Sequence, residues 1–207
     1  MNVLLAALAA YLIGALPWAL WVGKLARGVD VRQHGSGNLG ATNVYRTLGP
    51  GLGWTVFLLD AGKGVLAVLG ARLVGGPDFP GGSGSAGMIG ALFAVLGHAY
   101  TPFAGFKGGK GAATSAGAMI AMAPRPAALC LLCFLVAALA SKRISVGSIT
   151  AAVTLPIFLW LVPWSWSGKS AAVAGSIVAL FILVRHIPNM KRIAAGTEPV
   201  FYLRKKA

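Results

Sequence analysis

Residues 2–22, NVLLAALAAYLIGALPWALWV, carry no charged side chain, and this stretch decides the fold class. A helix needs about 20 apolar residues to cross the hydrocarbon core of a bilayer, which is about 30 Å thick. No basic region precedes the stretch and no clear cleavage signal follows it. We therefore expect a retained transmembrane helix rather than a signal peptide.

The rest of the chain has the same character. Of its 207 residues, 57% are hydrophobic and 11% are charged, with a mean hydropathy of +0.78. Soluble domains carry about 25% charged residues, so we predict an all-α polytopic membrane protein with residues 1–207 in one domain. Its helices are expected in seven apolar segments: residues 2–22, 53–74, 85–100, 111–123, 126–140, 148–163 and 169–187.

The chain is strongly basic, with 18 lysines and arginines against 4 acidic residues and a net charge of +14. In a soluble protein this would suggest nucleic-acid binding, which we do not expect here. In a membrane protein, basic residues gather on the cytoplasmic side and suit anionic lipids or phosphorylated substrates. Most of them lie in the loops after segments one, three and five and in the tail from Arg185. This predicts an external N-terminus and a cytoplasmic tail, and Trp164 and Trp166 fit an outer aromatic belt.

The first of these loops contains HGSGNLGATNVYR, residues 34–46. Formally it includes G-x-G-x-x-G, but the dinucleotide site needs a preceding strand, and the segment before this loop is predicted to be a helix. What remains is a glycine-dense loop whose amides can form an anion nest, ending at Arg46, which can bind a phosphate with two hydrogen bonds. The alternative is a polar turn with glycines at its bends.

The second loop contains FKGGKGAAT, residues 106–114. Its glycines let backbone amides crowd around a ligand, the following helix start adds unpaired donors, and two lysines add charge. The spacing does not match a Walker A motif, so a nucleotide hydrolase is not supported. The 13 residues of segment 111–123 rise about 20 Å against a core of about 30 Å. We therefore expect the loop to dip into the membrane.

Five further residues near or inside the segments carry polar groups or thiols. Asp60 and Lys63 share a helical face and are predicted to form a structural ion pair, with a direct catalytic role as the alternative. His98, at the end of a helix, is either a cap or interfacial residue or a catalytic group. Cys130 and Cys133 lie in an apolar run and are expected to be packed side chains rather than a redox or metal pair.

The third loop and the tail also place polar residues at the ends of apolar segments. Ser145 and Ser148 stand at the start of a segment, where one can cap the helix and the other is left for a substrate. His186 ends the last segment, where it is either an interfacial residue or a general base, and Asn189 is close enough in sequence to share its site. The basic residues of the tail alternatively bind anionic headgroups.

Four motifs in this order carry a family resemblance: GSGNLGATN with Arg46, GHAYTP followed by FKGGKGAAT, SVGSI, and RH-x-x-N-x-x-R followed by GTE. They resemble those of the bacterial acyl-phosphate:glycerol-3-phosphate acyltransferase family, the PlsY type. The resemblance covers essentially the whole chain. Pro188 is a departure within the last motif and is expected to bend or end the final helix early.

The resemblance implies transfer of a fatty acyl chain from acyl phosphate to the 1-hydroxyl of sn-glycerol 3-phosphate, giving lysophosphatidate and phosphate. It implies a site on the cytoplasmic face of the bacterial inner membrane, with no cofactor and no metal. By motif position, catalytic roles are implied for Ser36, Arg46, Lys110, Ser148, His186 and Asn189. Substrate-binding roles are expected for Asn38, Thr42, Asn43, Lys107, Gly108, Gly109, Gly111, Ser145 and Arg185.

Two questions stay open at this point. The base is either His186 or the donor's own phosphate, with His186 then orienting glycerol 3-phosphate, and the second is favoured because the donor carries a base beside the reacting carbon. The competing class of protein is an organophosphate transporter, which short helices and basic loops also suit. Against a transporter, the polar motifs lie on one predicted side and no inverted repeat is evident.

Overall fold

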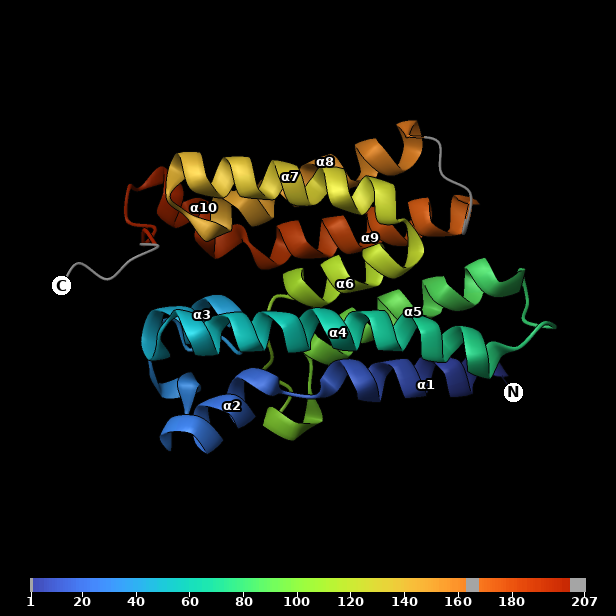
Figure 1. Ribbon diagram of the computed structural model, residues 1–207, viewed down its shortest axis with the longest axis horizontal. Helices are drawn as coiled ribbons and strands as arrows, with labels where there is room; N and C mark the ends of the chain where they lie inside the picture. The colour runs from blue at the N-terminus through green and yellow to red at the C-terminus, as the bar shows by residue number, and fades with distance from the viewer. Residues whose placement is uncertain (1, 163–167, 202–207) are drawn as a thin grey trace.

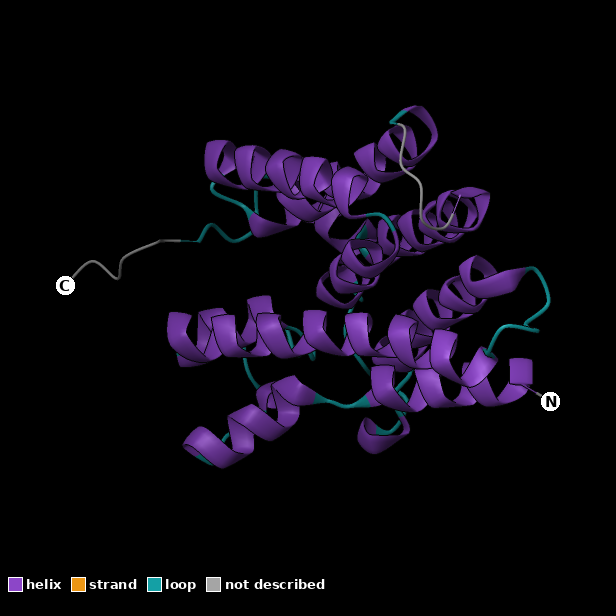
Figure 2. Ribbon diagram, turned by 45° about the vertical axis from the view of Figure 1, so that its right-hand side comes forward, coloured by secondary structure: helices purple, strands orange, loops and turns teal. Residues whose placement is uncertain are grey.

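The structure is a computed structural model that describes residues 2–162 and 168–201 (Figure 1). All regular elements within these ranges are helices, as Figure 2 shows, which confirms the all-α prediction. The helices are α1 (Asn2–Ala15), α2 (Trp18–Arg27), α3 (Ala41–Leu48), α4 (Pro50–Gly75), α5 (Gly82–Ala99), α6 (Ala112–Met122), α7 (Pro124–Ser141), α8 (Ile144–Leu161), α9 (Gly168–Arg185) and α10 (Ile187–Ala194).

By length and composition, five helical stretches among the described residues can cross a membrane, and a sixth does so if the bent pair α9–α10 is one span. Each of the seven predicted apolar segments contains a helix, but α6, with 11 residues, is shorter than a full span. The orientation of the termini stays a prediction. Trp164 and Trp166 of the predicted aromatic belt lie outside the described residues.

The first segment is not one continuous helix, which corrects the prediction for residues 2–22. It breaks between α1 and α2 because Pro17 has no amide hydrogen to continue the helical hydrogen bonds. The carbonyl of Ala15 accepts a hydrogen bond of 2.5 Å from Thr101 Oγ1. The carbonyl of Leu16 accepts one of 2.8 Å from Lys63 Nζ. Side chains from the neighbouring helices therefore stabilise the break.

Glycines let the helices approach backbone to backbone. A Cβ atom on Gly14 of α1 would lie 2.2 Å from the carbonyl oxygen of Ala94 on α5. On Gly117 of α6 it would lie 1.8 Å from that of Ala61 on α4. Such small-residue contacts are typical of helix packing in membranes. They place α1, α4, α5 and α6 in one group, and α7, α8 and α9 form the other group above it in Figure 1.

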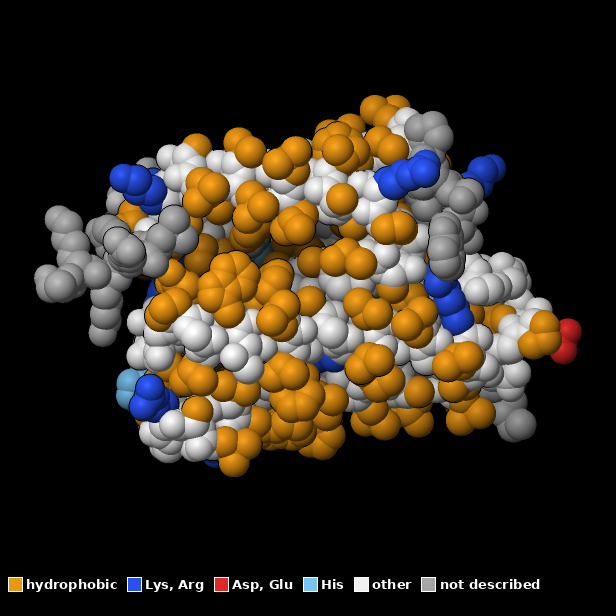
Figure 3. Space-filling model, viewed as in Figure 1, with side chains coloured by type: hydrophobic (Ala, Val, Ile, Leu, Met, Phe, Trp, Pro, Cys, Tyr) orange, Lys and Arg blue, Asp and Glu red, His pale blue; other side chains and the backbone are white. Residues whose placement is uncertain are grey.

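The surface agrees with a membrane environment. Leu4, Leu73 and Leu161 are 75%, 83% and 75% exposed. Hydrophobic side chains cover most of the face seen in Figure 3, and most of the visible Lys and Arg side chains lie toward its two ends. The left end of Figure 1 contains α2 and α3 in its lower part and α10 in its upper part, and this end carries the candidate site.

Candidate active site

Basic side chains from five segments converge at this end of the bundle. Each contacts Glu198, Asn189 or Gly109. Together they are called the basic cluster, which consists of Arg46, Lys110, Arg143, Arg185 and Arg192. The cluster joins the loops that carry the four sequence motifs.

Glu198 lies at the centre of the cluster and is 3% exposed. Its Oε2 accepts a hydrogen bond of 2.7 Å from Arg192 Nε, and its Oε1 accepts one of 2.8 Å from Asn189 Nδ2 and lies 3.9 Å from Arg46 Nη2. Burial opposes ionisation, but the neighbouring Ser145 hydroxyl, Asn189 and Arg192 outweigh it and hold the pKa of this carboxyl group below its usual value. The carboxylate therefore holds the arginines in place.

Lys110 donates a hydrogen bond to Asn189 Oδ1. Burial lowers its pKa to about 8, and the positive charge of Arg192 acts in the same direction. At neutral pH most of the molecules carry a charged Lys110 that is only partly compensated. Arg46 also keeps an unused hydrogen-bond donor, because its buried Nε has no partner among the described residues. Both cations are available to an anionic ligand.

His186 lies at the bend between α9 and α10, which meet at 51°. This agrees with the effect expected of Pro188, which lies in the first turn of α10. The His186 ring is buried, and its Nδ1 lies 2.8 Å from the carbonyl oxygen of Ile182. A carbonyl only accepts, so Nδ1 carries the hydrogen. In the neutral ring, Nε2 is then left with a lone pair for a substrate hydroxyl.

The glycine loop corrects part of the sequence interpretation. Gly108 N donates to the carbonyl of Ala99 over 3.0 Å, and Gly109 N donates to that of His98 over 3.1 Å. These two amides cap the end of α5, so they do not form a phosphate nest. Gly111, with φ of +87°, begins α6 without a side-chain cap. The charged Lys110 and the start of α6 are the groups of this loop left for a ligand, while Lys107 is exposed.

Asn43 shapes the first loop instead of facing a ligand. Its Oδ1 accepts from Ser36 N over 2.9 Å, and its Nδ2 donates to the carbonyls of Val31 and His34 over 2.9 and 3.1 Å. The side chain is buried with both ends of the amide in use, so the substrate-binding role expected of it is not supported. The Ser36 side chain is exposed beside it. Asn38 and Thr42 are half-buried near the start of α3.

The expected serine cap of α8 is wrong. Arg143 is the N-cap residue, and no side chain caps the helix. Ser148 Oγ instead donates to the carbonyl of Ile144 over 3.2 Å, within the helix. Ser145 Oγ is buried beside Glu198, whose charge its hydroxyl favours, and no hydrogen bond of normal geometry is formed to it among the described residues.

Glu198 and Arg192 were not among the expected site residues, although the last sequence motif contains both. A usable signal was present, because Glu198 is one of 4 acidic residues in a chain with a net charge of +14.

The ion pair between Asp60 and Lys63 is confirmed, with 2.8 Å between Oδ1 and Nζ. His98 is neither interfacial nor a cap, since it is 6% exposed and contacts that pair.

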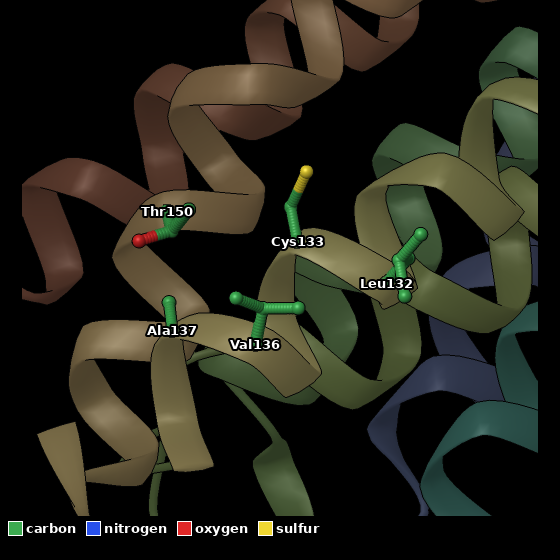
Figure 4. Close-up of a pocket in the computed structure, with 5 residues that line it drawn as sticks. All are labelled: Leu132, Cys133, Val136, Ala137 and Thr150. Atoms are coloured by element: carbon green, nitrogen blue, oxygen red, sulfur yellow. The ribbon is translucent and has the colours of Figure 1, made fainter. Parts of the chain in front are cut away.

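The two cysteines and an apolar hollow lie outside the basic cluster. Cys130 and Cys133 are free thiols packed on α7, as predicted. A hollow of about 340 Å³ on α7 and α8 is lined by Leu132, Cys133, Val136, Ala137 and Thr150 (Figure 4). None of these residues belongs to the basic cluster. No group of metal-ligating side chains occurs in residues 2–162 and 168–201.

Helices that span a membrane and a cationic, partly buried site at one end of the bundle define an integral membrane protein that acts on anionic molecules. Comparison with known proteins narrows this class. The family model described as "Glycerol-3-phosphate acyltransferase" matches residues 4–196. The chain belongs to this family and is a glycerol-3-phosphate acyltransferase of the PlsY type.

The relatives cover nearly the whole chain. A glycerol-3-phosphate acyltransferase of Thermosynechococcus vestitus is 40% identical over 94% of this chain and 93% of its own. Glycerol-3-phosphate acyltransferase 2 of Moorella thermoacetica is 42% identical over 94% and 95%. The crystal structure of the integral membrane acyltransferase PlsY (YgiH) in its glycerol 3-phosphate form matches with a TM-score of 0.86 at 36% identity, over 98% of this chain and 96% of that one. Its lysophosphatidic acid form matches with a TM-score of 0.85.

Proposed function

We propose that this acyltransferase uses acyl phosphate as its donor and esterifies the 1-hydroxyl of sn-glycerol 3-phosphate. The products are 1-acyl-glycerol 3-phosphate (lysophosphatidate) and inorganic phosphate, the first acylation step of phospholipid synthesis. One observation carries the proposal: the basic cluster brings together five cations, of which two, Arg46 and Arg192, pair with the carboxylate of Glu198. This surplus of positive charge suits two substrates that each bring a phosphate.

Each residue of the site has a distinct role in this proposal. Arg46 and Lys110 neutralise phosphate, and the free amides at the start of α6 add to their effect. Asn189 is held by Glu198 and in turn holds Lys110. Ser36, exposed on the first loop, and Ser148 contact the substrates. These groups lower the barrier by positioning the substrates and by neutralising charge.

The reaction needs one bond formed and one bond broken. The 1-hydroxyl oxygen attacks the carbonyl carbon of acyl phosphate, the new ester C–O bond forms, and the C–O bond to the phosphoryl group breaks. The phosphate that leaves takes the hydroxyl proton. His186 Nε2 accepts a hydrogen bond from glycerol 3-phosphate and orients it, because Nδ1 is committed to Ile182. Since acyl phosphate is already an activated anhydride, no carrier or cofactor is needed.

The proposed location follows from the two substrates. The acyl donor is greasy and enters from the bilayer, whereas glycerol 3-phosphate is soluble. A site at the cytoplasmic face of the bacterial inner membrane serves both. The basic residues of the loops and tail support this orientation by the positive-inside rule.

The test is phosphate release by purified protein in lipid. Release that requires both acyl phosphate and glycerol 3-phosphate, with lysophosphatidate formed in equal amount, supports the proposal. Acylation with a thioester donor alone would contradict the choice of acyl phosphate. Uptake of glycerol 3-phosphate into liposomes without acylation would contradict the reaction itself.

A further inference from the structure

Three ionisable side chains lie buried beside the glycine loop but outside the basic cluster. Asp60 and Lys63 come from α4 and His98 from α5, and they are 1%, 3% and 6% exposed. Lys63 Nζ lies 2.8 Å from Asp60 Oδ1, 2.8 Å from the carbonyl oxygen of Leu16 and 2.9 Å from His98 Nδ1. An ammonium group has three donors and no acceptor; Lys63 hydrogen-bonds to Leu16 and His98 and forms an ion pair with Asp60. Asp60, Lys63 and His98 are called the buried triad.

The triad fixes the hydrogen and the orientation of the His98 ring. Because Nδ1 accepts from Lys63, the neutral ring carries its hydrogen on Nε2. That side of the ring faces Gly109, where an added Cβ atom would lie 2.0 Å from Nε2. The His98 carbonyl also accepts from Gly109 N over 3.1 Å. His98 therefore contacts Gly109 with both its ring and its backbone.

Gly109 is the point where the site's loops meet. Its carbonyl oxygen accepts a hydrogen bond of 2.9 Å from Arg185 Nη2. A Cβ atom on it would also lie 2.7 Å from the carbonyl oxygen of Leu39 in the first loop. The next residue is Lys110, which binds Asn189. A shift of the His98 ring thus moves Gly109 and, through it, Lys110.

We propose that Lys63, held by Asp60, is a positioning residue that acts on Lys110 through His98 and Gly109. The inference rests on the phosphate-binding role proposed for Lys110. Charged groups inside a membrane segment are costly and are expected to serve function, and a buried ion pair is seldom more stable than a well-packed apolar pair. The triad exists because it holds the glycine loop against α5 at the correct place.

The test uses the Asp60→Asn/Lys63→Gln double variant, which removes both charges and leaves no buried charge unpaired. Small displacements of reacting groups cost up to about 100-fold in rate, so we expect kcat/KM to fall about tenfold or more. In a Lys110→Ala background the same double substitution is expected to cost less than about twofold, because the group it positions is gone. Lys169→Gln, an exposed lysine, is the control.

Two outcomes would overturn the proposal: an equal loss in both backgrounds, or full activity of the folded double variant. If the double variant does not fold, His98→Asn decides, because the amide oxygen keeps an acceptor for Lys63 while the ring against Gly109 is lost. A normal melting temperature with a similar loss of kcat/KM supports the proposal, and unchanged activity overturns it. Wild-type protein is assayed in parallel with acyl phosphate. If it is inactive, the donor proposal fails, and the variants are compared with the donor that wild-type protein accepts.

Discussion

Arg185 Nη2 donates a hydrogen bond of 2.9 Å to the main-chain carbonyl of Gly109, and its guanidinium lies 5.7 Å from the centre of the Tyr100 ring. The end of α9 is thereby attached to the loop before α6. A side chain that precedes His186 thus orders the loop that carries Lys110. The proposed substrate-binding role of Arg185 includes this structural contact.

Gly109→Ala is expected to disrupt the site more than the fold. The added Cβ atom would lie 2.0 Å from His98 Nε2 and 2.7 Å from the Leu39 carbonyl oxygen, and such overpacking costs about 1–3 kcal/mol of unfolding free energy. Activity should fall at least about 100-fold, because the displaced loop moves Lys110. Gly62→Ala on α4, where nothing lies within 4 Å of the new atom, is the control. Equal activity in the two variants would contradict the prediction.

Lys110 is expected to give the reaction an upper pH limit. Its pKa is about 8, so the charged form proposed to bind phosphate is lost as pH rises through 8, and kcat/KM should fall above that pH. A bound phosphate favours the charged form of Lys110. The fall of kcat, which reports the enzyme–substrate complex, should therefore occur at higher pH than the fall of kcat/KM. Lys110→Arg, which keeps its charge, should remove the fall at high pH. If activity of Lys110→Arg still falls above about pH 8 as in the wild type, the fall at high pH is caused by another group.

The same shift has the opposite effect on stability. In the folded protein the pKa of Lys110 lies below the 10.5 of an unperturbed lysine, so the unfolded chain binds more protons between about pH 8 and 10.5. The contribution of this group to the unfolding free energy therefore rises with pH across that window. Thermal melting of the wild-type and Lys110→Arg proteins at about pH 7.5 and about pH 9.5 measures how the stability of each changes with pH. A wild-type melting temperature that falls relative to the variant would contradict the sign.

His186→Gln distinguishes the two roles of the histidine. If His186 orients glycerol 3-phosphate, KM for this substrate should rise about tenfold while kcat persists. A collapse of kcat with KM unchanged would identify His186 as the base instead. His34→Gln, an exposed histidine of the first loop, is the matched control and should leave both constants unchanged.

Glu198→Gln should destabilise the site end of the bundle. Removing one partner of a buried ion pair costs about 3–5 kcal/mol, and we expect about 3 kcal/mol because Arg192 is 39% exposed. The low pKa of Glu198 adds a pH signature. Its contribution to stability is present above the usual glutamate pKa of 4.5 and is lost as pH falls through the lower pKa of the folded protein. Asp78→Asn, which replaces an exposed carboxylate, is the control and should keep the wild-type melting temperature at neutral pH.

Much of the fold follows from the sequence because uninterrupted apolar segments in a membrane have few alternatives to helix. Residues 111–123 were long enough for a helix and too short for a full span, and α6 confirms both. The break before α2 was less visible in the pattern. Pro17 lies in an apolar run, and the decisive partners of the freed carbonyls, Thr101 and Lys63, come from other helices.

For the site, the motifs identify which loops meet but not what each polar atom contacts. Glycine spacing suggests a phosphate nest at Gly108 and Gly109, yet their amides bind the carbonyls at the end of α5. An amide such as Asn43 serves a ligand or a loop equally well until its neighbours are known. Glu198 becomes meaningful only after α10 brings Asn189 and Arg192 to it.

The attachment of Glu198 to both Arg46 and Arg192 has a consequence for biogenesis. The site is assembled from the first loop, the second loop and the segment after α10. During synthesis, the earlier spans enter the membrane before the carboxylate that pairs their cations has been made. A nascent acyltransferase is therefore expected to hold an unfinished, strongly cationic site and to become active only when the last helices are in place.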